Sequence, residues 1–131
     1  MQYTLGMGKK ILIVEDKSLD ALGLSDVFEK WGYEVCGTAF TGERAIRLAE
    51  DLQPDLITMD VRIKGEVDGI EAAKRIRARR LVPIIFLSGY LKEDMAKELG
   101  EMDAVEFLTK PVDEGTLKDA VNKFLDGVAR A

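Results

Sequence analysis

The chain has 131 residues, of which 47% are hydrophobic and 33% charged, and this is the size of one compact domain with its own core. Its net charge of −5 argues against a direct nucleic-acid partner, because binding to a phosphate backbone needs a surplus of Lys and Arg. The sequence has no histidine, which excludes Ser-His and Cys-His nucleophile pairs, imidazole metal ligands and phosphohistidine carriers. Any chemistry must therefore use carboxylates, hydroxyls and lysines.

The sequence also lacks the features of a membrane or exported protein. No apolar run approaches the roughly 18 residues that a membrane span needs, and no charged and apolar leader precedes a small-residue cleavage site. We expect a soluble, cytoplasmic protein with no membrane partner. The single cysteine, Cys36, cannot form an internal disulfide and is expected to be a buried structural thiol.

In chain order, the first predicted elements are a strand and a helix. The apolar run KILIV predicts a buried strand at residues 10–14. Apolar residues at helical spacing follow it: Leu24, Val27, Phe28 and Trp31. Gly32 is expected just beyond the end of this helix, as its C′ residue.

A second strand and helix come next. YEVCGTA predicts a strand at residues 33–39 that places alternate residues on one side: Tyr33, Val35, Gly37 and Ala39. Thr41 is the expected N-cap of the following helix. The apolar face of that helix consists of Ala45, Leu48, Ala49 and Leu52.

The second half of the chain repeats the pattern. Apolar runs predict strands at residues 55–59, 83–87 and 104–108. Helices are predicted at residues 68–78, in a shorter segment that carries Leu91, Met95 and Leu99, and in a last segment with Asp113 as its N-cap. The apolar face of the last helix is Leu117, Ala120, Val121, Phe124, Leu125 and Val128. The basic run KRIRARR at residues 74–80 is interpreted as a solvated helix end, where the helix dipole favours cations.

Five strands alternating with five helices predict an α/β fold, a single doubly wound (βα)5 domain of the flavodoxin-like kind. The strands at residues 33–39 and 104–108 are interrupted by polar residues and should be the edges of a five-stranded parallel sheet. The predicted strand order is 2-1-3-4-5. We expect a flexible lead at residues 1–8, the domain at residues 9–128 and a tail at residues 129–131.

Polar residues lie at the carboxyl ends of four predicted strands. Glu15 and Asp16 follow the first strand and Asp60 the third, on either side of the switch point where ligands bind in such folds. Ser88 follows the fourth strand and Lys110 the fifth. Three converging carboxylates repel one another, and a hard cation such as Mg²⁺ would offset the repulsion. With a hydroxyl and a lysine nearby, the predicted site has the parts for phosphoryl transfer onto Asp60.

Five short motifs at these strand ends together carry a resemblance: VED (14–16), MD (59–60), DG (68–69), LSG (87–89) and KP (110–111). In this order they resemble the receiver domains of two-component response regulators, the CheY-like superfamily. The resemblance covers nearly the whole chain. The loop after Asp60, VRIKGEVDG, departs from the usual receiver pattern because it lacks a proline and is slightly longer.

The resemblance implies a role for each site residue. Asp60 would be the phosphoacceptor, and Mg²⁺ would be held by Glu15, Asp16, Asp60 and the backbone carbonyl of Arg62. Ser88 and Lys110 would contact the phosphoryl group, so that Asp60, Ser88 and Lys110 carry the chemistry. Ser88 and Phe107 would form the conformational switch, which changes the face made by the fourth helix, fifth strand and fifth helix. The Lys110-Pro111 peptide bond is expected to be cis, as is common in receivers.

The same resemblance implies the partners. The phosphoryl donor would be a histidine kinase or phosphotransfer protein, and the signal would pass to a downstream protein whose identity the motifs leave open. The resemblance implies that the chain is not an enzyme and that its only reactions are Mg²⁺-dependent self-phosphorylation and autodephosphorylation. It would be a monomer or a phosphorylation-dependent dimer, either as a stand-alone receiver or as a fragment of a larger protein.

Each residue also has a plainer interpretation. Asp16 could cap the first helix, Ser88 could be an ordinary turn residue, Lys110 a surface lysine and Phe107 a packing residue.

Two other classes of protein fit the sequence less well than the receiver, and a third is its most serious rival. In a flavodoxin-type cofactor binder, the carboxylates of the first loop, EDKSLD, would repel the phosphate of the cofactor. An aspartyl phosphatase would have a second Asp two residues after the nucleophile, where this sequence has Arg62. A phosphorylation-independent interaction module would bind no Mg²⁺, which a titration would show.

Overall fold

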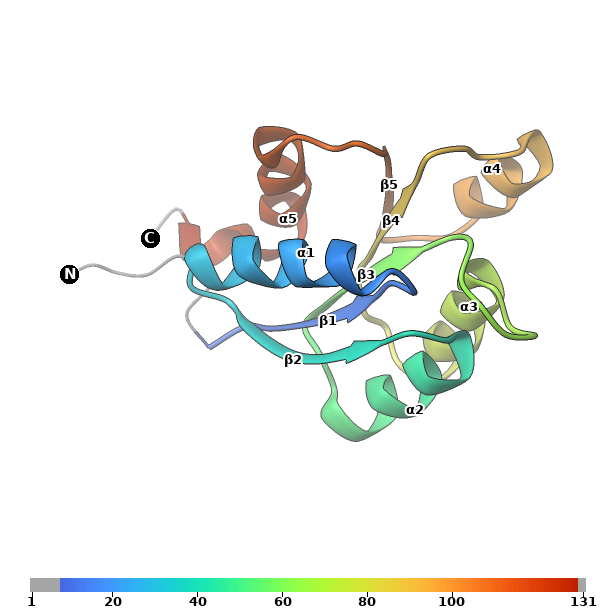
Figure 1. Cartoon of the computed structure of the whole chain (residues 1–131), viewed down its shortest axis with the longest axis horizontal. Coiled ribbons are helices and arrows are strands. Elements are labelled where there is room, and N and C mark those ends of the chain that lie inside the picture. Colours follow the sequence, from blue (N-terminus) through green and yellow to red (C-terminus); the bar gives the residue numbers. More distant parts are fainter. Residues whose placement is uncertain (1–7, 130–131) are drawn as a thin grey trace.

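The computed structural model describes residues 8–129, which form a five-stranded parallel sheet with helices on both faces (Figure 1). Residues 1–7 of the predicted lead and residues 130–131 of the predicted tail lie outside the described residues. Ala129 belongs to the last helix. Within residues 8–129, no helix combines the length and the apolar character that a membrane span requires.

The sheet has the predicted order, β2-β1-β3-β4-β5, and all of its neighbouring strands run parallel. The strands are β1 (Lys10–Val14), β2 (Glu34–Ala39), β3 (Leu56–Asp60), β4 (Ile84–Ser88) and β5 (Val105–Thr109). The three central strands are almost fully buried, whereas β2 and β5 are partly exposed. The prediction that the polar-interrupted strands are the edges is therefore confirmed.

The helices form two layers. They are α1 (Ser18–Lys30), α2 (Gly42–Leu52), α3 (Gly69–Arg79), α4 (Glu93–Gly100) and α5 (Glu114–Ala129). α1 and α5 pack on one face of the sheet around Phe28 and Val121, and α2, α3 and α4 cover the other face around Ile70 and Leu99 (Figure 1). The sheet thus has an apolar core on each side, which leaves its strand ends as the natural place for polar chemistry.

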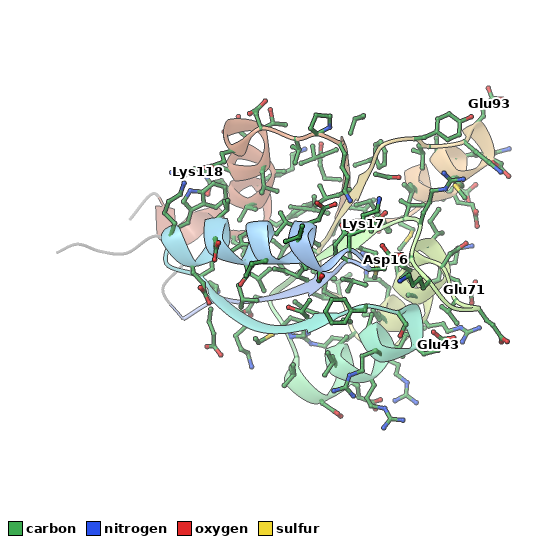
Figure 2. All side chains as sticks on the ribbon, in the orientation of Figure 1. Asp16, Lys17, Glu43, Glu71, Glu93 and Lys118 are labelled. Carbon is green, nitrogen blue, oxygen red and sulfur yellow. The ribbon has the colours of Figure 1, made fainter. Side chains whose placement is uncertain are left out.

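The helix ends follow the predicted signals. Thr41 accepts a hydrogen bond from the amide of Arg44, and Asp113 accepts one from the amide of Thr116. The hydrogen bond from the amide of Thr116 lowers the pKa of the Asp113 carboxyl. Gly32 follows α1 with φ +90°, the left-handed conformation that glycine adopts readily. Acids occupy the first turns of α2, α3 and α4, as Figure 2 shows for Glu43, Glu71 and Glu93.

The predicted alternation along β2 is wrong. Tyr33 and Val35 face α1 and α5, whereas Gly37 and Ala39 face α2. The cause is a β-bulge: Val35 pairs with Ile11 and Gly37 with Leu12, which leaves one extra residue, Cys36, between them. Cys36 is half-buried, and burial raises the pKa of its thiol.

Three strands end one residue later than predicted. Asp60 and Ser88 are the last residues of β3 and β4, and Asp60 pairs with Leu87 while Ser88 pairs with Thr109. The predictions ended at the last apolar residue, but the backbone ladder continues through the polar ones. Asp60 and Ser88 are consequently held by the sheet rather than by a loop.

Two helical predictions need correction or completion. Leu91 lies before α4 rather than in it, because the helix begins after Lys92, although Leu91 still packs against the core. In α5, the backbone departs from helical angles at Leu125 (φ −126°, ψ 32°). The side chain of Val128, predicted to lie on the apolar face of α5, is outside the described side chains.

The basic run at the end of α3 is largely neutralised. Lys74 pairs with Glu98, Arg75 with Glu71 and Arg79 with Glu50, while two arginines donate to backbone carbonyls. This supports the interpretation of a solvated helix end.

A glycine sets the distance between α3 and the end of β3. A Cβ atom at Gly69 would lie 2.1 Å from the carbonyl oxygen of Asp60, so Gly69→Ala must shift the backbone there. We expect the substitution to lower the free energy of unfolding by about 1–3 kcal/mol in urea denaturation. The control is Gly23→Ala in α1, where nothing lies within 4 Å, and it should raise stability by about 0.5–1 kcal/mol. Equal effects of the two substitutions would contradict this explanation.

Candidate functional site

Three carboxylates meet at the carboxyl ends of β1 and β3. Glu15, Asp16 and Asp60 each offer an oxygen, and these oxygens all lie within 4.8 Å of one another. Glu15 is 1% exposed and Asp60 6%, whereas Asp16 is half-buried. The sequence predicted this meeting, because parallel strands bring their carboxyl ends to one edge.

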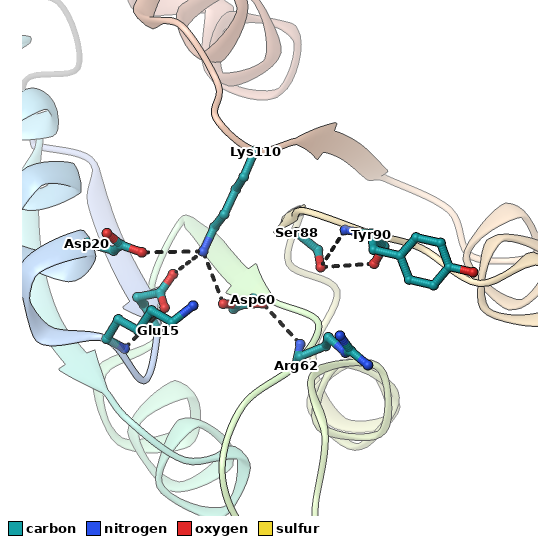
Figure 3. Close-up of polar contacts among 8 residues, drawn as sticks. Glu15, Asp20, Asp60, Arg62, Ser88, Tyr90 and Lys110 are labelled. Atoms are coloured by element: carbon teal, nitrogen blue, oxygen red, sulfur yellow. Dashed lines mark hydrogen bonds and ion pairs between the residues drawn. The ribbon is translucent and has the colours of Figure 1, made fainter.

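Lys110 extends from the end of β5 into this cluster (Figure 3). Its Nζ atom lies 2.7 Å from Oε1 of Glu15 and 3.1 Å from Oδ2 of Asp60. The backbone amide of Lys110 donates to the carbonyl oxygen of Ser88, and the Lys110-Pro111 peptide is cis, as predicted. The lysine is therefore a partner of the buried carboxylates and not a free surface cation.

A fourth carboxylate, which the strand-end pattern did not predict, also borders the site. Asp20, in the first turn of α1, has Oδ2 3.8 Å from Nζ of Lys110. The signal was an acid four residues after Asp16, at helical spacing, in the helix that begins at this edge of the sheet. Its nearness to Lys110 depends on a contact between distant parts of the chain.

The pKa values of two groups reflect their burial and their contact. Burial raises the pKa of Glu15, and the hydrogen bonds from Lys110 and from the amide of Lys17 only partly offset it. Burial disfavours the charged form of Lys110, but the hydrogen bonds to Glu15 and Asp60 outweigh it, so its pKa is raised. Lys110 thus stays charged at neutral pH.

The loop after Asp60 has a defined path. The amide of Arg62 donates to Oδ1 of Asp60 at 3.0 Å, while the Arg62 side chain is exposed. The loop then crosses to the start of α2, where Lys64 forms a parallel bridge with Thr41. The hydrogen bond from Arg62 therefore ties one carboxylate oxygen of Asp60 to the loop that follows it.

The interpretation of Asp16 as a helix cap is wrong. Lys17 occupies the N-cap position of α1, and no side chain of the described residues caps this helix. The carboxylate of Asp16 instead belongs to the acidic cluster.

Ser88 is the last residue of β4 and Phe107 lies within β5, the two strands that follow β3 in the sheet order. Ser88 is buried, and its hydroxyl donates to the carbonyl oxygen of Tyr90 at 3.1 Å, a local turn bond. In the part of the chain that the structure describes, no hydrogen bond joins Ser88 to Asp60. Phe107 is half-buried, pairs with Phe86 across β4 and β5, and lines an open pocket of about 390 Å³ between α4 and β5.

This fold, with an acidic cluster and a lysine at its switch point, defines the class of the protein. The sequence matches the response regulator receiver domain family over residues 11–122, and the chain belongs to this family. Aspartate phosphorylation and Mg²⁺ binding are general in receiver domains, which are signalling domains and generally not enzymes.

Particular relatives agree with this assignment. Chemotaxis protein CheY of Thermotoga maritima is 36% identical over 118 residues, which cover 89% of this chain and 98% of CheY. The transcriptional regulatory protein PdtaR of Mycobacterium tuberculosis is 34% identical over 113 residues, 86% of this chain, and the chain spans 55% of its length. The receiver domain of the sensor histidine kinase PA1611 of Pseudomonas aeruginosa has a TM-score of 0.78 and 31% identity. That match covers 92% of this chain and 99% of the solved structure, which has a magnesium ion coordinated in its active-site cleft.

Removing Lys110 should destabilise the protein in a pH-dependent way. Lys110→Met leaves the Glu15 carboxylate buried without its cation, so we expect the free energy of unfolding to fall by about 2–4 kcal/mol at neutral pH. The folded pKa of Glu15 already lies above its ordinary value of 4.5, and losing Lys110 raises it further. Because the folded protein then binds the Glu15 proton more tightly than the unfolded chain, the loss shrinks as the pH falls through the folded pKa and below 4.5.

Urea unfolding at about pH 7 and about pH 4 measures this difference. The matched control is Lys123→Met, which breaks an exposed ion pair with Glu106 and should cost less than about 1 kcal/mol at both pH values. A loss for Lys110→Met that is the same at both pH values would contradict the assignment to Glu15.

Proposed function

We propose that this protein is a phosphoacceptor in a two-component system, which takes a phosphoryl group from a histidine kinase or phosphotransfer protein onto Asp60. The observation that carries the proposal is the cluster of three carboxylate oxygens within 4.8 Å, with the Lys110 ammonium 3.1 Å from Asp60. Membership of the receiver family supports it.

The donor atoms fit Mg²⁺. All of them are oxygens, and two of the three carboxylates are buried, so repulsion among them favours a hard divalent cation with open coordination positions. Glu15, Asp16, Asp60 and the backbone carbonyl of Arg62 would hold the ion. Bound Mg²⁺ would neutralise charge on the phosphoryl oxygens. The magnesium ion in the PA1611 receiver domain supports this assignment.

The transfer uses groups of this chain in defined roles. A carboxylate oxygen of Asp60 attacks the phosphorus atom, which forms an O–P bond and breaks the P–N bond of the donor phosphohistidine. The nitrogen keeps the electron pair of the broken bond. Lys110 turns from a carboxylate oxygen to a phosphoryl oxygen, and Ser88 exchanges its bond to Tyr90 for a bond to another phosphoryl oxygen.

The movement of Ser88 would couple the site to a surface. Phe107 rotates inward as Ser88 moves toward the phosphoryl group, and the face of α4, β5 and α5 changes for a downstream protein. Phe107 lines the open pocket between α4 and β5, so its side chain is not fully enclosed by neighbouring atoms before it moves. The phosphoryl group biases the two states only through its contacts with Ser88 and Lys110. The chain acts as a monomer or as a dimer that phosphorylation assembles.

Asp60→Asn should abolish phosphorylation. Incubation of the unaltered protein with Mg²⁺ and a small acyl-phosphate donor should add one phosphoryl group, seen by intact mass and removed by hydroxylamine. The Asp60→Asn protein should stay unmodified, because an amide oxygen is a poor nucleophile. Asp26→Asn, an exposed acid of α1, is the control and should label normally.

Labelling of Asp60→Asn at the normal rate would show that the phosphoacceptor assignment is wrong. If the unaltered protein does not label, a Mg²⁺ titration separates a receiver that only a kinase can phosphorylate, which binds the ion, from an interaction module, which does not.

Ser88→Ala should separate labelling from signalling. The variant keeps Asp60, the acidic cluster and Lys110, so it should still take up one phosphoryl group. Without the hydroxyl, amide chemical shifts in α4, β5 and α5 should change much less on phosphorylation than in the unaltered protein, as measured by ¹⁵N nuclear magnetic resonance. Undiminished shift changes on that face would remove Ser88 from the switch.

A further inference from the structure

Asp20 is the one carboxylate near Lys110 to which the proposed function gives no role. In the range of residues 8–129, three carboxylates lie within 4 Å of the Lys110 ammonium, those of Glu15, Asp60 and Asp20. Figure 3 shows that Asp20 approaches the ammonium from the side of α1, while Asp60 approaches it from β3. Asp20 is 51% exposed, so it is not needed to fill the core.

We propose that Asp20 is a positioning residue for Lys110, which accepts the ammonium when a divalent cation takes the oxygens of Glu15 and Asp60. This inference rests on the proposed function, because it assumes that the acidic cluster binds Mg²⁺. It assigns Asp20 neither to the metal nor to the phosphoryl group.

Lys110 and a divalent cation would compete for the same carboxylate oxygens. Lys110 contacts Oε1 of Glu15 and Oδ2 of Asp60, and both residues belong to the cluster that would bind the cation. A divalent ion repels an ammonium at such short range, so Lys110 has to give up at least one of these contacts when the ion binds.

The displaced ammonium then needs another partner. The Lys110 side chain is only 25% exposed, and burial already disfavours its charge. Asp20 lies 3.8 Å away on the solvent side of the cluster, close enough to accept the ammonium through a small side-chain rotation. A neighbouring carboxylate therefore lowers the free energy of the state with both cations present, and metal binding becomes tighter.

Asp20 should also be easily released. Its exposure to solvent screens the pair with Lys110. A phosphoryl group on Asp60 offers Lys110 a partner of higher charge at the centre of the site, so Lys110 can leave Asp20 again. Asp20 thus favours metal binding without holding the lysine away from the phosphoryl group.

The experiment is a calorimetric Mg²⁺ titration at low ionic strength. Asp20→Asn should bind Mg²⁺ about threefold to fivefold more weakly than the unaltered protein, because the displaced Lys110 loses a partly exposed ion pair. Asp26→Asn removes the same charge from an exposed position on the same helix and should change the affinity by less than about twofold.

A double-mutant cycle with Lys110→Met tests whether Asp20 acts through the lysine. In the Lys110→Met background, Asp20→Asn should change Mg²⁺ affinity no more than Asp26→Asn does. An undiminished effect of Asp20→Asn without the lysine, or equal effects of Asp20→Asn and Asp26→Asn with it, would overturn the proposal. If the unaltered protein binds no Mg²⁺, the proposed function fails and takes this inference with it, which is a different result from a weakly sensitive Asp20.

A labelling rate gives a second readout. At saturating Mg²⁺, Asp20→Asn should label with an acyl phosphate at least as fast as the unaltered protein, since Asp20 takes no part in the transfer and the metal site is already filled. Slower labelling at saturating Mg²⁺ would mean that Asp20 takes part in the transfer itself, and would overturn a purely positioning role.

Discussion

The contact of Lys110 with two buried carboxylates is the interaction on which the site depends. Glu15 and Asp60 repel each other at the switch point, and neither is exposed enough for water to screen the repulsion. Lys110 offsets their charge from the far edge of the sheet, and its own amide is held by the end of β4. The sheet therefore determines the distances between Glu15, Asp60 and Lys110, and the ammonium of Lys110 offsets the repulsion between the two carboxylates.

The geometry of parallel strands explains why so much of this arrangement follows from the sequence. The polar residues that interrupt β2 and β5 predicted the strand order. The polar residues that follow the apolar runs of the strands predicted the site. Glu15, Asp16, Asp60 and Lys110 were predicted to meet, and they do. These predictions need only local patterns and a known topology.

The features that the sequence did not predict depend, with one exception, on contacts between distant segments. Strict alternation of side chains along a strand requires that each residue pairs with one residue of the neighbouring strand. The bulge at Cys36 breaks this alternation in β2, because Cys36 is an extra residue without a partner in β1. The pairing of Thr41 with Lys64 and the nearness of Asp20 to Lys110 join residues 23 and 90 positions apart. The bond from Ser88 to Tyr90 is local, but turn chemistry and site chemistry use the same residue types.

The packing around the end of β3 is tight on the side of α2 and open on the side of α4. Toward α2, the loop after Asp60 is pinned by the bridge at Lys64, and a Cβ atom on Gly42 would lie only 2.3 Å from the carbonyl oxygen of Val67. Toward α4, an open pocket of about 390 Å³ lies between this short helix and β5, and among the described residues no side chain caps the first turn of the helix. The packing therefore opposes displacement toward α2 more strongly than displacement toward α4.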